Sequence, residues 1–273
     1  MTLRYGPTLG FSHQAVHDHG RLINTNWTTL EDQPLTGKSV NDLVNNAIPT
    51  IRHRGFLSAD RCRDLVHIVQ QYQIANKETY LNRVEEANSL QKRFKEEANI
   101  DILARVAALL QEATGLETRV AHEGDRSYFA GLIRAVNDYI QIHSDYAPYD
   151  GAGWEIGKIT SQLTWNILLK QVPGGDTIIY DRQWKGAADD EAFRKAFPRY
   201  AYEPAGVQGS IFKAMKAVEG DLTFFNSRNF HEVKPCDKAW DRPDDVVRYT
   251  MSSFVGYLPG QSKGAPPSLI LWS

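Results

Sequence analysis

Two residues that can bind a metal ion, His143 and Asp145, lie two positions apart in the segment YIQIHSDY at 139–146. The segment alternates in polarity, which predicts an extended strand whose alternate side chains share a face. His143 and Asp145 would then lie opposite Ile140 and Ile142, so that one face packs and the other can bind an ion. A polar strand edge at the surface is the alternative, and an isolated His-x-Asp pair favours that alternative.

His231 is the third candidate ligand, and it comes from a distant part of the chain. It follows the apolar segment GDLTFFNS at 220–227 and a tight turn around Ser227-Arg228-Asn229. Two imidazoles and one carboxylate on adjacent strands form the facial arrangement that suits non-haem Fe(II) and leaves positions open for other ligands. Taken alone, His231 would be interpreted as a structural histidine.

Arg248 begins a third polar pattern, in the segment VVRYTMSSFVGYL at 246–258. Alternation places Arg248, Thr250 and Ser252 on one face of a strand. A guanidinium beside a hydroxyl can bind a carboxylate through two hydrogen bonds. Because a buried arginine without an anion is costly, the pattern predicts a carboxylate ligand. A solvent-exposed arginine is the alternative.

Helices are expected in the first part of the chain, where they would support these strands. One begins after the N-cap Ser58, and a second, highly charged one with a solvated face covers about 80–97. A third runs from near Asn99 to a C-terminal cap at Gly115. Residues 1–50 are expected to form an irregular arm with one short strand near 48–51.

Strands are expected to dominate the rest of the chain. Segments 129–136 and 139–146 have the turn chemistry of a hairpin, through Asn137-Asp138. The long strand at 159–172 is expected to pair with 176–184. A short helix near 189–197 and three further strands complete the set, the strands lying at 220–227, 229–235 and 246–258.

This order of elements predicts the fold class α+β. We expect a double-stranded β-helix core (jelly-roll or cupin-like) over 116–273, with the irregular arm and supporting helices over 1–115. The strands that carry His143 and Arg248 span most of the C-terminal half, so dividing that half would destroy the site. A single domain over 1–273 is therefore expected.

Composition excludes several classes of protein. The 273 residues carry 31 Lys and Arg against 33 Asp and Glu, a net charge of −2, which gives no basis for binding nucleic acid or an anionic membrane. Cys62 and Cys236 lie far apart and indicate neither a disulfide framework nor a zinc cluster. No apolar run approaches the length of a membrane span, and no secretory signal is visible. We expect a cytoplasmic protein with a small-molecule substrate; its oligomeric state stays open.

Taken together, three motifs resemble the Fe(II)/2-oxoglutarate-dependent oxygenase superfamily. They are His143-Ser144-Asp145, Gly220-Asp221 leading to His231, and Arg248-Tyr249-Thr250. The resemblance covers roughly residues 128–257. The segment PGGDTIIYDRQW at 173–184 is similar to the small-molecule branch, which includes free-amino-acid hydroxylases and carrier-independent aliphatic halogenases.

The resemblance implies a cofactor set and a reaction. His143, Asp145 and His231 would bind Fe(II), with 2-oxoglutarate as cosubstrate and O₂ as oxidant. An unactivated C–H bond of a small polar molecule, such as an amino acid or a derivative, would be hydroxylated, with release of succinate and CO₂. The halogenases of this branch carry a small residue in place of the metal carboxylate, so the presence of Asp145 favours hydroxylation.

The resemblance also assigns residues to the cosubstrate. Arg248 would bind the distal carboxylate of 2-oxoglutarate, and Thr250 would add a hydroxyl to the same site. Thr164 and Asn166 share one face of the 159–172 strand and are further candidates for this pocket. An exposed polar strand face is the alternative interpretation for the last two.

The substrate would be bound by residues near the metal strand. The Gly-rich aromatic segment YAPYDGAGWEIGK at 146–158 is expected to form a lid, with Tyr146, Tyr149 and Trp154 closing over the substrate. Trp184 is a further candidate, as is Arg134, which would pair with a substrate carboxylate. Packing or solvent exposure is the alternative for each of them.

Two other functions stay open. One is an iron oxidase, oxidative cyclase or desaturase on the same fold, which need not keep a carboxylate receptor such as Arg248. The other is a non-catalytic jelly-roll binding module, against which the three intact ligand candidates argue.

Overall fold

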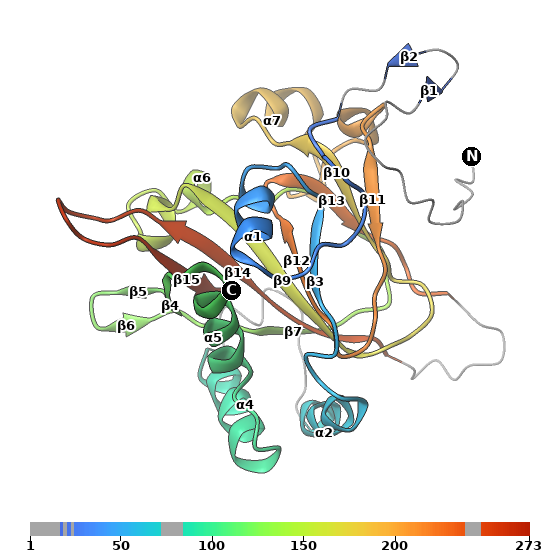
Figure 1. Ribbon diagram of the computed structural model, residues 1–273. Coiled ribbons are helices and arrows are strands. Elements are labelled where there is room, and N and C mark those ends of the chain that lie inside the picture. The colour runs from blue at the N-terminus through green and yellow to red at the C-terminus, as the bar shows by residue number, and fades with distance from the viewer. Residues whose placement is uncertain (1–16, 19–20, 23–24, 72–83, 238–246) are drawn as a thin grey trace.

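Two sheets stacked face to face form the core of the computed structural model, which describes residues 17–18, 21–22, 25–71, 84–237 and 247–273 (Figure 1). The large sheet has the order β3-β12-β9-β14-β15-β4, and β7 also pairs with β14. The small sheet has the order β11-β10-β13-β8. All these pairs are antiparallel except β15 with β4. The α+β jelly-roll prediction is confirmed.

The strands have the following bounds. Those of the large sheet are β3 (Thr50–His53), β4 (Glu117–Val120), β7 (Leu132–Ala135), β9 (Ser161–Lys170), β12 (Leu222–Asn226), β14 (Tyr249–Leu258) and β15 (Ser268–Trp272). Those of the small sheet are β8 (Ile140–His143), β10 (Thr177–Gln183), β11 (Phe212–Met215) and β13 (Asn229–Val233). Two short ribbons pair β1 (His17–Asp18) with β2 (Arg21–Leu22), and β5 (His122–Glu123) with β6 (Arg126–Ser127).

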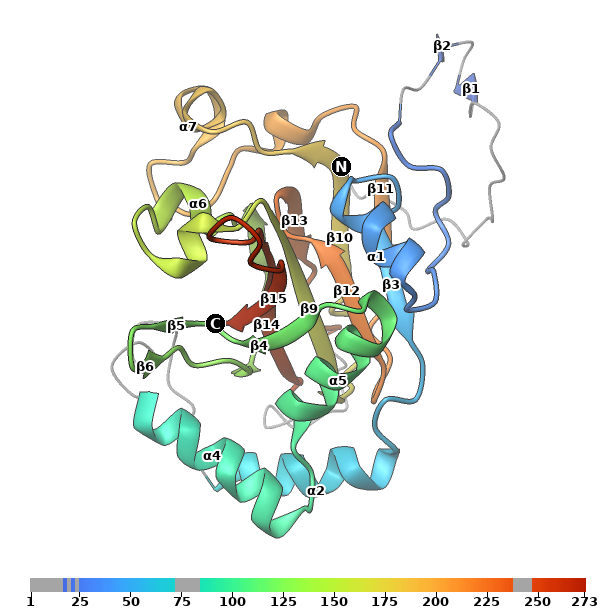
Figure 2. The ribbon, with the colours of Figure 1, turned by 60° about the vertical axis from the view of Figure 1, so that its left-hand side comes forward.

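Four helices cover the outer face of the large sheet: α1 (Gly37–Val44), α2 (Ala59–Gln70), α4 (Val84–Glu97) and α5 (Ile102–Thr114). Figure 2 shows α2 and α4 side by side at the base of the molecule. Their apolar side chains share one core with the sheet, for example Leu65 and Phe94 with Trp165, Phe224 and Met251. Shorter turns of helix are α6 (Ala147–Asp150), η1 (Glu155–Lys158), α7 (Ala187–Phe193) and η2 (Pro204–Val207).

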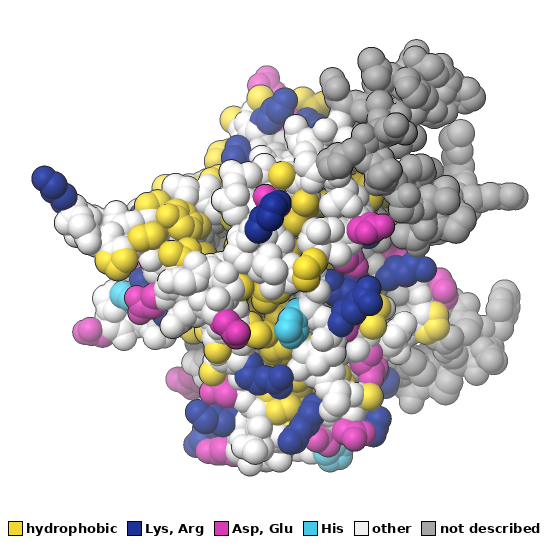
Figure 3. Space-filling view, viewed as in Figure 1, with side chains coloured by type: hydrophobic (Ala, Val, Ile, Leu, Met, Phe, Trp, Pro, Cys, Tyr) yellow, Lys and Arg dark blue, Asp and Glu magenta, His cyan; other side chains and the backbone are white. Residues whose placement is uncertain are grey.

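The predicted helix boundaries are confirmed where a cap defines them. Ser58 accepts a hydrogen bond from the Arg61 backbone N–H, and Gly115 ends α5 in the left-handed conformation with φ 72°. The start of α5 lies at Ile102 rather than near Asn99, because Asp101 is the residue whose side chain caps the helix. On the face in Figure 3, basic and acidic side chains are interspersed over α2 and α4, as expected for solvated helices.

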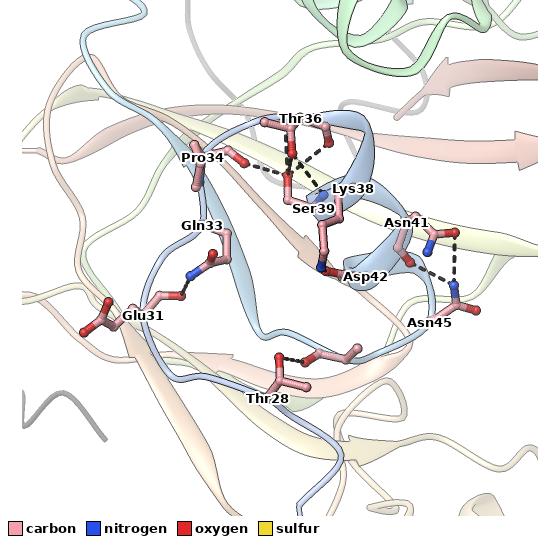
Figure 4. Close-up of polar contacts among 11 residues, drawn as sticks. Thr28, Glu31, Gln33, Pro34, Thr36, Lys38, Ser39, Asn41, Asp42 and Asn45 are labelled. Atoms are coloured by element: carbon pink, nitrogen blue, oxygen red, sulfur yellow. Dashed lines mark hydrogen bonds and ion pairs between the residues drawn. The ribbon is translucent and has the colours of Figure 1, made fainter. Parts of the chain in front are cut away.

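The irregular arm predicted for residues 1–50 contains a helix, α1, which corrects that expectation. Thr36 and Ser39 form a reciprocal cap: the Ser39 backbone N–H donates to Thr36 Oγ1 at 3.1 Å, and the Thr36 backbone N–H donates to Ser39 Oγ at 2.9 Å (Figure 4). The helix is short and buries only Val40 and Leu43 as apolar side chains, so its periodicity is weak. The expected short strand is β3, at Thr50–His53.

Both predicted hairpins are wrong. β7 pairs with β14 in the large sheet, whereas the next strand, β8, pairs with β13 in the small sheet. The Asn137-Asp138 segment crosses between the sheets instead of turning back. Asn137 holds this crossing in place, because its side-chain oxygen accepts from the Arg248 backbone N–H at 2.8 Å and its carbonyl accepts from the Cys236 N–H at 2.8 Å.

The predicted pairing of 159–172 with 176–184 is also wrong, because the chain again crosses from one sheet to the other. β9 pairs with β12 and β14, whereas β10 pairs with β11 and β13, so Pro173-Gly174-Gly175 is another crossing. A jelly roll alternates between its two sheets along the chain, and local turn chemistry cannot distinguish a crossing from a hairpin. β11 and β15 were not among the expected strands. The predicted short helix appears as α7. Residues 1–16, 80–83 and 246, which belong to expected elements, lie outside the described residues.

The two faces of the large sheet differ in chemistry. On β9, Leu163, Trp165 and Ile167 belong to the core under the helices. Gln162 and Thr164 alternate with them and are also buried, although they do not belong to that core. They lie on the inner face, toward the small sheet, and this face carries the polar groups of the site.

Candidate metal centre and adjoining cavity

Three side chains from two segments of the small sheet converge on one point. A ligand atom from each of His143, Asp145 and His231 lies within 4.8 Å of the others. His143 Nε2 is 3.7 Å from Asp145 Oδ2, and His231 Nε2 is 3.6 Å from the same oxygen. Because His143 and His231 are direct partners across β8 and β13, their rings lie on one face, with centroids 4.1 Å apart. The structure thus brings the three candidate ligands together.

The backbone of each histidine's own strand fixes its ring. His143 Nδ1 donates to the Gln141 carbonyl at 2.7 Å, and His231 Nδ1 donates to the Asn229 carbonyl at 2.9 Å. A carbonyl oxygen can only accept, so the proton of each neutral ring lies on Nδ1. Nε2 of each ring therefore presents its lone pair to the common point, which is the arrangement that metal-binding histidines require.

Asp145 reaches this point through a loop, because β8 ends at His143. The Asp145 backbone N–H donates to the Ser227 carbonyl at 2.9 Å, and Ser144 Oγ donates to the Arg228 carbonyl at 3.0 Å. These bonds attach the Asp145 loop to the turn that leads into β13 and His231. His143 and Asp145 do lie on the same side, as strand alternation predicts. Their placement also depends on the contacts of the Asp145 loop with the turn before β13.

The donor set fits a non-haem iron ion. Two neutral imidazole nitrogens and one carboxylate on one side form the facial set typical of Fe(II) and leave the opposite side open. Thr164, on the facing strand β9, has a buried Oγ1 with no hydrogen-bond partner among the described residues. Its strand neighbour Phe225 contacts His231, with ring centroids 4.9 Å apart. A buried hydroxyl without a partner next to this site indicates space for a polar ligand.

Arg248 lies further along the inner space, just before β14. It is 6% exposed, its Nε has no hydrogen-bond partner among the described residues, and no described carboxylate lies within ion-pair distance. Burial lowers the pKa of this guanidinium, although the nearby Cys236 and Asp176 oppose the shift. A buried cation that lacks a partner is costly, so the position fits an anionic ligand. Gly175 packs against it: a Cβ at this residue would lie 3.0 Å from Arg248 Nε.

The other candidates for the cosubstrate pocket line the route between the metal ligands and Arg248. Register pairs Thr250 with Arg134, and Ser252 with Asn166, so these four residues share the inner face. The Arg134 guanidinium donates to Ser252 Oγ. Arg134 thus lies near Thr250 on the Arg248 side of the site.

A cavity of about 470 Å³ opens on the other side of the metal ligands, with Asp145 in its wall. Of the predicted substrate residues, Tyr146 and Trp154 line it, and so do parts of α6 and η1 from the predicted lid. The full lining comprises Tyr128, Asp145, Tyr146, Ala147, Asp150, Gly151, Trp154, Ile156, Gln162, Phe254 and Trp272.

Trp184 and Arg134 are not among the lining residues. The indole N–H of Trp184 donates to Asp190 at 3.0 Å, and its ring packs in a cluster with Ile142, Tyr202 and Phe230. Tyr149, a residue of α6, packs edge-on against Trp184, with ring centroids 4.6 Å apart. This contact anchors α6 to the Trp184 cluster.

Several residues of the cavity wall were not among the predicted site residues. Gln162 and Phe254 carried a usable signal, because they continue the same strand alternation as Thr164 and as Arg248, Thr250 and Ser252. Asp150 lies in the predicted lid segment at 146–158 but was not singled out. Tyr128 and Trp272 carried no signal, since they come from a loop and an unexpected strand.

The chain has relatives of known name and neighbours of known structure. No family model matches the sequence. The chain is 48% identical over 210 residues to "Leucinostatins biosynthesis cluster protein S" of Purpureocillium lilacinum, covering 76% of this chain and 84% of that protein. It is 33% identical over 167 residues to the "L-gamma-glutamyl-L-propargylglycine hydroxylase" of Streptantibioticus cattleyicolor, covering 60% of this chain and 56% of the relative.

Solved structures share the fold at low identity. An N-substituted L-amino acid dioxygenase from Burkholderia ambifaria superposes with a TM-score of 0.55 at 15% identity, over 87% of this chain and 91% of that chain. Its complex with alpha-KG superposes with a TM-score of 0.51 at 14% identity over the same shares. Within the described residues, no helix is both long and apolar enough to cross a membrane.

Proposed function

The chain belongs to the Fe(II)/2-oxoglutarate-dependent oxygenases, and we propose that it hydroxylates an unactivated C–H bond in a small molecule derived from an amino acid. The observation that carries the proposal is the position of Asp145, which converges with His143 and His231 and also forms part of the cavity wall. A molecule in the cavity would therefore lie beside the metal.

His143, Asp145 and His231 are the residues that would hold the iron. Iron bound with 2-oxoglutarate and O₂ supplies an oxidant strong enough to attack a C–H bond, with succinate and CO₂ as by-products. The protein fixes the geometry: the Gln141 and Asn229 carbonyls orient the two imidazoles, and the Ser227 carbonyl anchors the Asp145 loop. Such positioning avoids reorganisation during the reaction.

Arg248 would bind the distal carboxylate of 2-oxoglutarate. Its burial supports this role, as does its lack of a carboxylate partner among the described residues, and Thr250 lies next to it on the inner face. Thr164, with its buried hydroxyl, and Asn166 lie between Arg248 and the cavity and would contact the body of the cosubstrate. An iron oxidase that does without 2-oxoglutarate would have no use for a buried cation at this position.

The names of the relatives support the substrate class. The relative from Streptantibioticus cattleyicolor is named as a hydroxylase of an amino-acid derivative, and the relative from Purpureocillium lilacinum is named for leucinostatin biosynthesis. A complete carboxylate-containing ligand set favours hydroxylation over halogenation. Desaturation and ring closure would use the same residues and differ only in the position of the C–H bond.

An anaerobic titration with Fe(II) and 2-oxoglutarate tests the proposal. The wild-type protein should develop the weak visible charge-transfer band of a chelated iron complex, and His231→Ala should abolish it. Admission of O₂ with a panel of amino-acid derivatives should then release succinate faster than without them. A wild-type protein that shows no band would refute the cofactor assignment, and a band without substrate-stimulated succinate release would refute the reaction.

A further inference from the structure

The wall of the cavity has an asymmetric set of charges. Among its lining residues the charged ones are Asp145 and Asp150, and none is Lys, Arg or His. Under the proposed function Asp145 binds the iron, so its charge is compensated there. Asp150 is then the carboxylate that the cavity wall offers to a substrate.

Gln162 adds an uncommitted hydrogen-bond donor at the bottom of the cavity. The residue is only 1% exposed, and its Oε1 accepts from the Ala147 backbone N–H at 2.7 Å, which attaches α6 to β9. Its amide nitrogen donates to none of the described residues and therefore has two N–H groups left. Because Gln162 lines the cavity, these N–H groups can donate to a carbonyl oxygen on the ligand.

Asp150 is likewise uncommitted. It ends α6, and its carboxylate forms no hydrogen bond or ion pair with a residue in the described part of the chain. The neighbouring cation Arg194 is held elsewhere: it lies 3.4 Å from Asp190 and donates to the Tyr202 hydroxyl at 3.2 Å. Asp150 is exposed, but partial desolvation raises the pKa of its carboxyl, an effect that Arg194 reduces and that Asp145 and Asp190 increase. A cationic partner would favour the charged form of this carboxyl.

The remaining wall is aromatic and aliphatic. Phe254 and Trp272 face each other across β14 and β15, with ring centroids 5.6 Å apart, and Tyr128 and Trp154 meet edge-on at 6.3 Å. A volume of about 470 Å³ lies within the range of drug-sized ligand sites, which is generous for one free amino acid.

We propose that the cavity takes an amino-acid derivative with a free ammonium group and a masked carboxyl group, such as an amide or a short peptide amide. The ammonium group binds Asp150, the neutral carbonyl accepts from Gln162, and an aliphatic side chain lies against Phe254 and Trp272. A free carboxylate would face the uncompensated Asp150 and no Lys, Arg or His among the lining residues, which disfavours zwitterionic amino acids. The inference rests on the proposed function in one respect, the commitment of Asp145 to iron.

Four probes with the same aliphatic side chains separate the charges. They are leucyl-leucinamide, leucyl-leucine, N-acetyl-leucyl-leucinamide and N-acetyl-leucyl-leucine. Binding is measured by tryptophan fluorescence, because Trp154 and Trp272 line the cavity. The protein is used without metal and, separately, loaded with Fe(II) and 2-oxoglutarate under anaerobic conditions, so that affinity is read without turnover.

Leucyl-leucinamide should bind most tightly. Asp150→Asn should weaken this probe by about tenfold, the low end for a hydrogen bond to a charged group, and leave the acetylated amide almost unchanged. Asp150→Glu should retain the preference. Glu191→Gln, which removes one negative charge from the exposed surface of α7, is the matched control and should change nothing.

The inference is overturned if either free acid binds as tightly as leucyl-leucinamide, if no probe binds, or if Asp150→Asn keeps the preference for the cationic amide. This outcome is distinct from failure of the proposed function. The charge-transfer band and succinate release test the iron and 2-oxoglutarate chemistry, whereas the order of probe affinities in the metal-free protein tests the cavity alone.

Discussion

The two ends of the space between the sheets carry side chains of opposite charge. At one end, Arg248 is a buried cation that has no anionic partner in the described part of the chain and packs against Gly175. At the other end, the cavity presents Asp150 among aromatic rings. Phe254 and Arg248 are six positions apart, about 20 Å at the rise of an extended strand. His231 contacts Phe225, whose partner Thr164 pairs with Phe254, so the metal ligands lie nearer the Phe254 end.

This contrast shows how one inner face can separate two small molecules. A dicarboxylate is attracted to the Arg248 end and repelled from the acidic cavity, whereas an ammonium compound has the opposite preference. Under the proposed function both ends are needed for the reaction, but each should respond separately to mutation. Four predictions test this separation, from the largest expected effect to the smallest.

His231→Ala should disable both ends together, because it removes a metal ligand at their junction. We expect turnover to fall at least about a hundredfold, since even residues that only orient metal ligands are worth ten- to a hundredfold. Succinate release and metal content measure the effect. Phe225→Leu, which keeps an apolar neighbour beside the ring, is the control; an equal loss in both variants would point to packing instead.

Arg248→Leu should weaken the binding of 2-oxoglutarate at the Arg248 end and leave the cavity end unchanged. The KM for 2-oxoglutarate should rise about a hundredfold, consistent with the ~2–5 kcal/mol lost when one member of a buried charge pair is removed. The affinity of leucyl-leucinamide in the metal-free protein should stay within about twofold of wild type, because the two ends do not touch. A parallel loss at both ends would contradict the separation.

Gly175→Ala should perturb the Arg248 end less than Arg248→Leu does. Gly175 has φ +75°, and a Cβ there would lie 3.0 Å from Arg248 Nε, so the guanidinium must move. The KM for 2-oxoglutarate should rise about tenfold, in line with ~1–3 kcal/mol of local strain. Gly186→Ala likewise places a side chain at a positive φ, +81°, but with open space around its Cβ. It should lower thermal stability similarly without changing the KM.

The pH dependence of probe binding tests the cavity end. Partial desolvation raises the pKa of Asp150 above that of an ordinary aspartate, so the carboxylate becomes protonated at a higher pH than usual. Affinity for leucyl-leucinamide should therefore be full above this raised pKa and fall as the pH drops through it. Iron on Asp145 should reduce the shift, because it compensates one of the charges that raise this pKa. Asp150→Asn should remove the acidic limb, and a profile unchanged by this variant would exclude the assigned role.

The sequence by itself determined the candidate residues for the chemistry. His143, Asp145, His231 and Arg248 could be proposed because residue type and strand alternation are local properties, and because the three motifs together resemble those of a known superfamily. The caps at Ser58 and Gly115 were predictable for the same reason, since they depend on neighbouring residues alone.

Only the tertiary structure decided which strands pair and where the substrate space lies. Asn137-Asp138 and Pro173-Gly174-Gly175 have the composition of hairpin turns, yet both cross between sheets, because burying two apolar faces outweighs the local turn preference. The cavity wall draws Tyr128, Asp150, Gln162, Phe254 and Trp272 from separate segments. No local pattern joins them, since their proximity follows from the packing of the whole core.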